Sequence, residues 1–230
     1  MFLASFPTGQ WQANCYVVAP AGSTDVVVVD PGQDAAGGLR QLFSEHGLRP
    51  AAILATHGHF DHVADAALIA DEFGVGVWIH SADRHLLTDP GAALSPDGAA
   101  LVRQLLRVPM VEPARVEELD GIRELTLAGL DFTLHPAPGH TPGSTLFSLA
   151  YAAPTSQITR IVFTGDVVFA GSIGRTDLPG GDQTTMNQTL AHTVLPLVDS
   201  CALLPGHGPQ TTMGRERTSN PYLQSPFLRN

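Results

Sequence analysis

The hydrophobic pattern of the N-terminal part alternates between short apolar runs and an amphipathic stretch. Residues 26–29 and 51–55 are unbroken apolar runs, each followed by polar positions, and both are predicted to be buried strands. Between positions 61 and 73 apolar residues recur at helical spacing, and Gly74 follows, which predicts a helix that ends there. Residues 76–79 fit a further short strand.

The C-terminal part adds a period of two. Residues 125–134 alternate around Ala128-Gly129, which predicts a hairpin with one buried face. Further strands are predicted at 145–149, 158–163 and 202–204, a helix over 184–198, and helices joined by loops over 83–115. Strands and helices are mixed, with several hairpins, so the pattern predicts a layered α/β or α+β domain rather than an all-parallel sheet.

Length and composition narrow the class of protein. The chain has 230 residues, 43% of them hydrophobic and 15% charged, which is typical of one mid-sized globular domain. We expect this domain to span residues 1–210 and residues 211–230 to form a C-terminal tail. A hydrophobic core of this size stabilises the fold without a structural metal, so a bound metal is expected to be functional. No apolar run approaches the ~18 residues of a membrane span, and no signal peptide is recognised, so we expect a soluble cytoplasmic protein.

Charge and cysteine content exclude some partners. The 12 basic and 22 acidic residues leave a net charge of −10, which disfavours nucleic-acid binding and is partly offset if divalent metals bind. Cys15 and Cys201 are too few for a disulfide framework and lack zinc-ribbon spacing, so we expect them to be buried. All basic residues are arginine, which together with the many alanines suggests a GC-rich genome.

A dense histidine and aspartate cluster follows the second predicted strand. In this cluster Thr56 precedes His57, His59, Asp61 and His62, a pattern expected by chance roughly once in a thousand such sequences. Alternate residues after a strand point the same way, so His57 and His59 can close on one metal. Asp61 and His62 lie where the helix starts and can turn toward a second metal. Zinc, iron and manganese all accept these ligands.

Three more polar side chains lie in similar settings. His140 is in a Pro-Gly-His-Thr-Pro-Gly loop between two predicted strands, and His207 is in Pro-Gly-His-Gly-Pro directly after a strand. Proline and glycine fix tight loops that expose the imidazole, so both histidines are predicted metal ligands. Asp166 ends a strand in Thr-Gly-Asp, where it either bridges two metals or caps a turn.

These motifs, in this order, resemble those of the metallo-β-lactamase superfamily. Asp30 in Val-Asp-Pro-Gly fits the early strand-end aspartate of that family, and the resemblance runs from about Asn14 to Pro209. It implies an αββα sandwich of mixed sheets with the metals at one sheet edge. It also implies a first metal on His57, His59 and His140, a second on Asp61, His62 and His207, and a bridging Asp166.

Within the superfamily, residues 169–182, 204–209 and 214–222 resemble the short glyoxalase II-type hydrolases, which cleave hydroxyacyl-glutathione thioesters such as S-D-lactoylglutathione. The resemblance implies two divalent metals, zinc first with iron or manganese as alternatives, and a metal-bridging hydroxide that attacks the thioester carbonyl. Asp61 and Asp166 are its catalytic carboxylates, and Asp61 orients the hydroxide. Arg175 is the candidate for binding the carboxylate of the thiol, unless it simply faces solvent.

The glyoxalase II resemblance leaves the thiol open. Only 23 residues follow His207, so the C-terminal helical region with which long glyoxalase II proteins hold glutathione is missing. The carrier is therefore glutathione or another low-molecular-weight thiol. The sequence predicts no nucleic-acid or membrane partner and leaves the oligomeric state open.

Other activities on the same fold remain as alternatives. A persulfide dioxygenase would use a single iron on His57, His140 and Asp166, although the Pro-Gly-His-Gly-Pro loop fits the hydrolases better. A lactone, β-lactam or phosphodiester hydrolase is a further alternative, and a non-catalytic metal-binding module is another.

The remaining candidates are expected to be structural. Trp11 and Trp78 are predicted core residues, and His135 a loop residue near the site. Four histidines match no ligand motif and are expected on the surface or in helices: His46, His80, His85 and His192.

Overall fold

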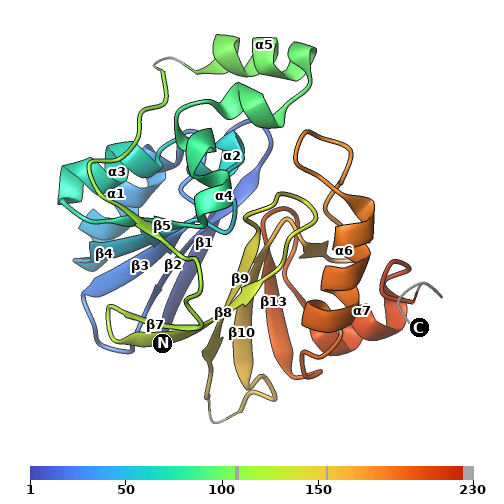
Figure 1. The fold of residues 1–230 in the computed structure, drawn as a ribbon. Helices are drawn as coiled ribbons and strands as arrows, with labels where there is room; N and C mark the ends of the chain where they lie inside the picture. The colour runs from blue at the N-terminus through green and yellow to red at the C-terminus, as the bar shows by residue number, and fades with distance from the viewer. Residues whose placement is uncertain (107–108, 154, 225–230) are drawn as a thin grey trace.

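Two six-stranded sheets pack face to face, and helices cover both outer faces (Figure 1). This computed structural model describes residues 1–106, 109–153 and 155–224. The first sheet has the order β1(Phe2–Thr8), β2(Ala13–Ala19), β3(Asp25–Val29), β4(Arg49–Leu54), β5(Val77–Ile79), β6(Val116–Glu118). Strands β3 to β6 run parallel to one another, whereas β1 and β2 are antiparallel to their neighbours.

The second sheet is mostly antiparallel. Its order is β14(Thr211–Thr212), β13(Cys201–Pro205), β10(Arg160–Gly165), β9(Thr145–Ala150), β8(Leu130–Pro136), β7(Glu124–Leu127). Only β10 and β13 pair in parallel. A separate hairpin, β11(Val168–Phe169) with β12(Ser172–Ile173), follows the end of β10.

The helices fall into three groups. On the first sheet lie α1(Ala35–His46) and α3(Ala66–Phe73); on the second lie α6(Gln183–Thr189), the π-helical turn η3(Leu190–Val194) and α7(Met213–Ser219). The third group lies above the sheets in Figure 1: α2(Phe60–Val63), α4(Ser81–Arg84), η1(His85–Leu87), η2(Pro90–Ala93), α5(Pro96–Leu105). No helix in the described part of the chain combines the length and apolarity needed to span a membrane.

The unbroken apolar run of β3 is explained by burial on both faces. Val26 and Val28 pack under the outer helices α1 and α3, whereas Val27 and Val29 face the second sheet and pack near Phe163. Successive strand residues point to opposite faces, so a strand covered on both sides needs apolar residues throughout. The predicted αββα sandwich of mixed sheets is confirmed.

Two helix predictions are wrong in extent. The stretch 61–73 is not one helix, because the amide of Asp65 bonds to Pro31 O at 3.1 Å instead of continuing the helix, which separates α2 from α3. The helix expected over 184–198 stops at residue 194, ahead of Pro196, whose nitrogen has no hydrogen to donate.

The structure also differs from the sequence-based predictions for one histidine, one helix and the C-terminal segment. His135 lies in β8 rather than in a loop, and its Nε2 lies 2.9 Å from Ser148 Oγ. The pattern did not predict α1, whose Gly37 and Gly38 weaken the helical signal. Residues in the expected tail form β14, which pairs with β13, and α7, whose Met213 is fully buried.

Candidate metal centre

The candidate ligands gather at one edge of the two sheets because strands end there. Strand β4 ends just before Thr56 and His57, β10 ends just before Asp166, and β13 ends just before His207. The β8–β9 loop brings His140 to the same place, 4.8 Å from His57 between ring centroids. Residues from four separate parts of the chain are thereby brought into one cluster.

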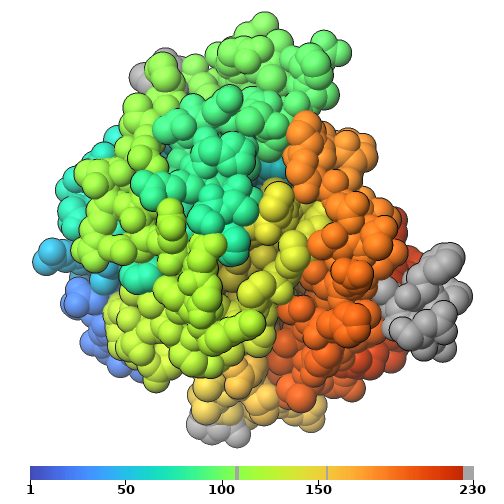
Figure 2. Space-filling view, viewed as in Figure 1, coloured from blue at the N-terminus to red at the C-terminus, as the bar shows by residue number. Residues whose placement is uncertain are grey.

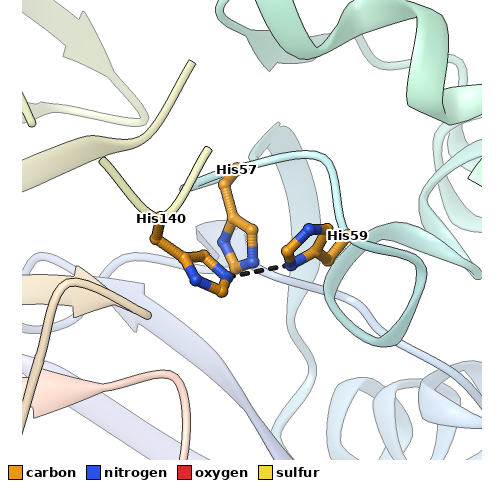
Figure 3. Close-up of side chains that lie close together, drawn as sticks. All are labelled: His57, His59 and His140. Atoms are coloured by element: carbon orange, nitrogen blue, oxygen red, sulfur yellow. Dashed lines mark hydrogen bonds between the residues drawn. The ribbon is translucent and has the colours of Figure 1, made fainter. Parts of the chain in front are cut away.

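His57, His59 and His140 form the first triad. Their candidate ligand nitrogens lie within 4.8 Å of one another, and all three side chains are buried. Figure 3 shows the rings converging from two loops, with His140 Nε2 2.9 Å from His59 Nδ1. Three imidazoles converging at this separation match the donor set of a metal site.

Asp61, His62 and His207 form the second triad, with ligand atoms again within 4.8 Å. His207 Nε2 lies 3.3 Å from both Asp61 Oδ2 and His62 Nε2. Although His62 is adjacent to Asp61 in the α2 helix, His207 comes from the other sheet. The second triad therefore depends on the packing of the two sheets.

Asp166 lies between the triads. Its Oδ2 is 3.7 Å from His140 Nε2 of the first triad and 3.5 Å from His207 Nε2 of the second. Its Oδ1 is 3.4 Å from His62 Nε2. A carboxylate that faces both groups is in the position required of a bridging ligand.

Hydrogen bonds behind the triads orient four of the five imidazoles. In each, Nδ1 faces an oxygen, which leaves Nε2 for a metal: His57 with Thr56 Oγ1 at 3.1 Å, His62 with Asp30 Oδ2 at 3.0 Å, His140 with Arg175 O at 2.8 Å, His207 with Trp11 O at 3.0 Å. Thr56 Oγ1 donates its own hydrogen to Asp30 Oδ2 at 2.7 Å, so it accepts from His57.

The residues present fit a bound metal. His57 Nε2, His59 Nε2 and Asp166 Oδ1 are buried and have no hydrogen-bond partner among the described residues, and unpaired buried polar atoms are costly. Burial and the neighbouring imidazoles lower the pKa of His57, and burial with His140 lowers the pKa of His59 to about 3. Both rings are therefore neutral near pH 7, as a metal requires.

The charge of the second triad also favours a cation. Burial opposes ionisation of Asp166, yet the adjacent His62 prevails and lowers its pKa. The pKa of Asp61 is lowered as well, since His62 and His207 outweigh its burial. Burial alone would lower the pKa of His62, but Asp166 and Asp61 raise it, which shows that this position attracts positive charge.

A cavity of about 650 Å³ opens above the triads. Its floor includes His59, Asp61, His140, Asp166 and His207. Its walls are largely apolar and come from segments far apart in the chain: Trp11, Phe60, Leu94, Leu101, Val102, Phe169, Ile173, Leu178. In the space-filling view the green helical segment and the orange loop face each other across this hollow (Figure 2).

Trp11 was wrongly assigned to the core. Its side chain is 39% exposed, lines the cavity and meets Phe60 edge-to-face at 4.9 Å between ring centroids. Trp78 is partly buried and packs between the sheets, as predicted.

Arg175 lines the cavity, and its guanidinium donates to both carboxylate oxygens of Asp177, at 2.7 and 2.8 Å.

The sequence profile of the metallo-beta-lactamase superfamily matches residues 8–207. The chain belongs to this superfamily. Its resemblance to glyoxalase II-like members is supported by the hydroxyacylglutathione hydrolase GloC of Haemophilus influenzae, which is 34% identical over 98% of this chain and 99% of the relative.

Solved structures of superfamily members show the same fold. The crystal structure of the BLEG-1 B3 metallo-beta-lactamase superposes with a TM-score of 0.82, at 33% identity, covering 97% of this chain and 100% of the other. The di-iron-bound form of TTHA1623 has a TM-score of 0.74 at 34% identity, covering 96% and 100%. Members of this superfamily are hydrolytic enzymes, and the grouped His and Asp side chains of this chain fit the use of a divalent metal.

All seven predicted ligand residues lie together in this superfamily chain. The four histidines expected outside the site are not part of either triad: His46, His80, His85, His192. The sequence did not reveal the part played by Thr56, although its place directly before the histidine motif is a usable signal. It also gave no sign that Trp11 O accepts from His207.

Proposed function

We propose that this chain is a metal-dependent thioester hydrolase that acts on hydroxyacyl-thiols such as S-D-lactoylglutathione. The observation that carries the proposal is two complete ligand triads on either side of Asp166, at the floor of an apolar-walled cavity. The similarity to GloC supports the thioester as substrate.

The first triad would hold one metal, the second triad another, and Asp166 would contact both. A bound pair of divalent metals lowers the pKa of water and polarises a carbonyl oxygen. Zinc fits these nitrogen and oxygen donors, and iron and manganese fit them too. The di-iron form of TTHA1623 is a precedent for iron in a relative.

The residues of the chain position the reactants. Asp61 Oδ2, on the cavity floor, accepts a hydrogen bond from the attacking water and so directs its oxygen toward the thioester carbon. The attacking water gives up one proton to solvent as its oxygen forms a C–O bond there, the C–S bond breaks, and the thiolate leaves with the electron pair. Trp11 and Phe60 form an apolar wall beside this point and exclude bulk water from it.

The second triad favours hydrolysis over the persulfide dioxygenase alternative. An iron site on His57, His140 and Asp166 would make no use of Asp61, His62 and His207, yet these lie within 4.8 Å of one another. His62 is also fixed by Asp30, at 3.0 Å from Nδ1 to Oδ2. A complete and oriented second ligand set is expected of a two-metal hydrolase.

The test is hydrolysis of S-D-lactoylglutathione by the purified protein, with release of free thiol as the readout. Turnover should stop with a metal chelator and return when zinc, iron or manganese is added back. His57→Ala should be inactive under all of these conditions. Oxygen uptake with glutathione persulfide, or turnover of a β-lactam in place of the thioester, would instead support one of the alternatives.

Arg175 is proposed to bind a carboxylate of the thiol carrier. Its ion pair with Asp177 is 60% and 69% exposed, and exposed pairs are weak enough for a substrate carboxylate to displace Asp177. For Arg175→Ala we expect KM for S-D-lactoylglutathione to rise roughly 3-fold to 10-fold with little change in kcat. His140 should keep its partner, because that bond uses the backbone oxygen of Arg175.

The matched substrate is the N-acetylcysteamine thioester of D-lactate, which has no carboxylate. Its steady-state KM should be the same for Arg175→Ala and for the unaltered protein. An equal rise in KM for both thioesters would show that Arg175 does not recognise a carboxylate.

A further inference from the structure

Asp83 is a buried carboxylate that belongs to neither ligand triad. It lies in α4, its side chain is fully buried, and it accepts three hydrogen bonds. Oδ2 accepts from the Gly58 amide at 2.9 Å and from the Thr141 hydroxyl at 2.6 Å, and Oδ1 accepts from the Gly143 amide at 2.8 Å. A buried charge is tolerated only when donors surround it in this way.

The three donors come from the two loops that make the first triad. Gly58 lies between His57 and His59, whereas Thr141 directly follows His140. Asp83 is therefore bonded to both sides of the first triad at once, although it follows the histidine motif by more than twenty positions. The second triad is held differently, through Asp30 and the Trp11 carbonyl.

Two glycines let the loops approach this carboxylate. A Cβ at Gly143 would lie 2.6 Å from Asp83 Cγ, and a Cβ at Gly58 would lie 2.8 Å from the Asp83 carbonyl oxygen. A side chain at either position would therefore force Asp83 or the loop to shift. Both loops therefore reach Asp83 only because glycine occupies the points of contact.

We propose that Asp83 is a positioning residue that holds the loops of His57, His59 and His140 together and so sets the metal affinity of the first triad. Without its carboxylate, the amides of Gly58 and Gly143 lose their acceptor, and the two loops are no longer linked. The imidazoles then sample a wider range of separations than a metal accepts. The second triad keeps its own supports.

The test measures zinc binding to the full-length protein by competition with a chromophoric chelator. Asp83→Asn is made in two backgrounds. His207→Ala disrupts the second triad and keeps the first intact, whereas His140→Ala disrupts the first triad and keeps the second intact. In the His207→Ala background, Asp83→Asn should raise the zinc dissociation constant roughly 10-fold to 100-fold, the usual effect of losing a residue that supports a ligand. In the His140→Ala background it should change less than about 2-fold.

Glu216→Gln is the matched control. Glu216 is also fully buried and accepts three bonds, from the Gly171 backbone amide, the Thr211 hydroxyl and the Asn220 side-chain amide, and none of these three partners is a ligand residue. The Glu216→Gln substitution should lower thermal stability and leave the zinc dissociation constants of both triads unchanged. The proposal is overturned if Glu216→Gln raises the zinc dissociation constant of the first triad as much as Asp83→Asn does. It is also overturned if Asp83→Asn raises the zinc dissociation constants of both triads by the same factor.

A second variant covers the case in which Asp83→Asn does not fold. Thr141→Val keeps the side-chain shape and the Asp83 carboxylate but removes one of its donors. It should raise the zinc dissociation constant of the first triad about 3-fold to 10-fold, as expected for one hydrogen bond to a charged group. An unchanged constant would overturn the proposal.

Discussion

Asp166→Ala is expected to lower kcat/KM for thioester hydrolysis by roughly 10³-fold, which corresponds to about 4 kcal/mol of transition-state stabilisation. The carboxylate lies 3.4 Å from His62 Nε2 and 3.7 Å from His140 Nε2, so its loss removes a side chain that faces both triads. Bound metal per chain should fall together with activity. Metal analysis and steady-state kinetics on the same preparation check both expectations.

The control separates loss of the site from loss of the fold. Asp131→Ala removes an exposed carboxylate near the far edge of the second sheet, where it accepts from the Thr126 hydroxyl, and should leave activity and metal content unchanged. The metal-free form of Asp166→Ala should unfold at nearly the temperature of the unaltered metal-free protein, because the neighbours of Asp166 are the ligand histidines. If Asp166→Ala retains full metal content and activity, Asp166 does not bridge two metals.

Gly206→Ala is expected to have the next largest effect. A Cβ at this position would lie 2.1 Å from Asp166 Oδ1 and 2.7 Å from His62 Cε1, so a ligand has to move. The backbone has little room to yield, because the Gly206 amide donates to Gly165 O at 2.8 Å and its carbonyl accepts from Asn14 at 2.7 Å. A displacement of about 1 Å at a catalytic centre costs roughly 10²-fold in rate.

Stability should fall as well, by about 1–3 kcal/mol, the usual cost of overpacking a tightly filled position. Urea unfolding of the metal-free protein measures this free energy. The matched control is Gly37→Ala in α1, where a Cβ meets nothing within 4 Å and should stabilise the helix by about 0.5–1 kcal/mol. Normal activity in Gly206→Ala would contradict this prediction, because it would show that Asp166 and His62 can move away from the new Cβ without loss of catalysis.

The sheets were largely predictable because burial is visible in their sequence. Residues 26–29 are apolar throughout since β3 is covered on both faces, and residues 125–134 alternate since one face of the hairpin is buried. The helix predicted over 61–73 failed where a tertiary hydrogen bond, from Asp65 to Pro31, competed with the helical one. Local periodicity carries no information about such a partner.

The residues behind the ligands were the least predictable. Trp11 has the size of a core residue, and only the packing shows that its ring lines the cavity and its carbonyl accepts from His207. Asp83 lies in no motif, and its three donors are 25, 58 and 60 positions away in the chain. Contacts between residues so distant leave no mark on local pattern or composition.

The sequence by itself determined which residues can bind metal, because the dense motif at 57–62 and the glycine-flanked His140 and His207 specify side-chain chemistry and loop geometry locally. Only the tertiary structure decided how these residues divide around Asp166, which nitrogen each imidazole presents, and what walls the cavity above them. The physical reason is that donor atoms are chosen by residue type, whereas their distances and orientations are set by the packing of two sheets and by hydrogen bonds between distant loops.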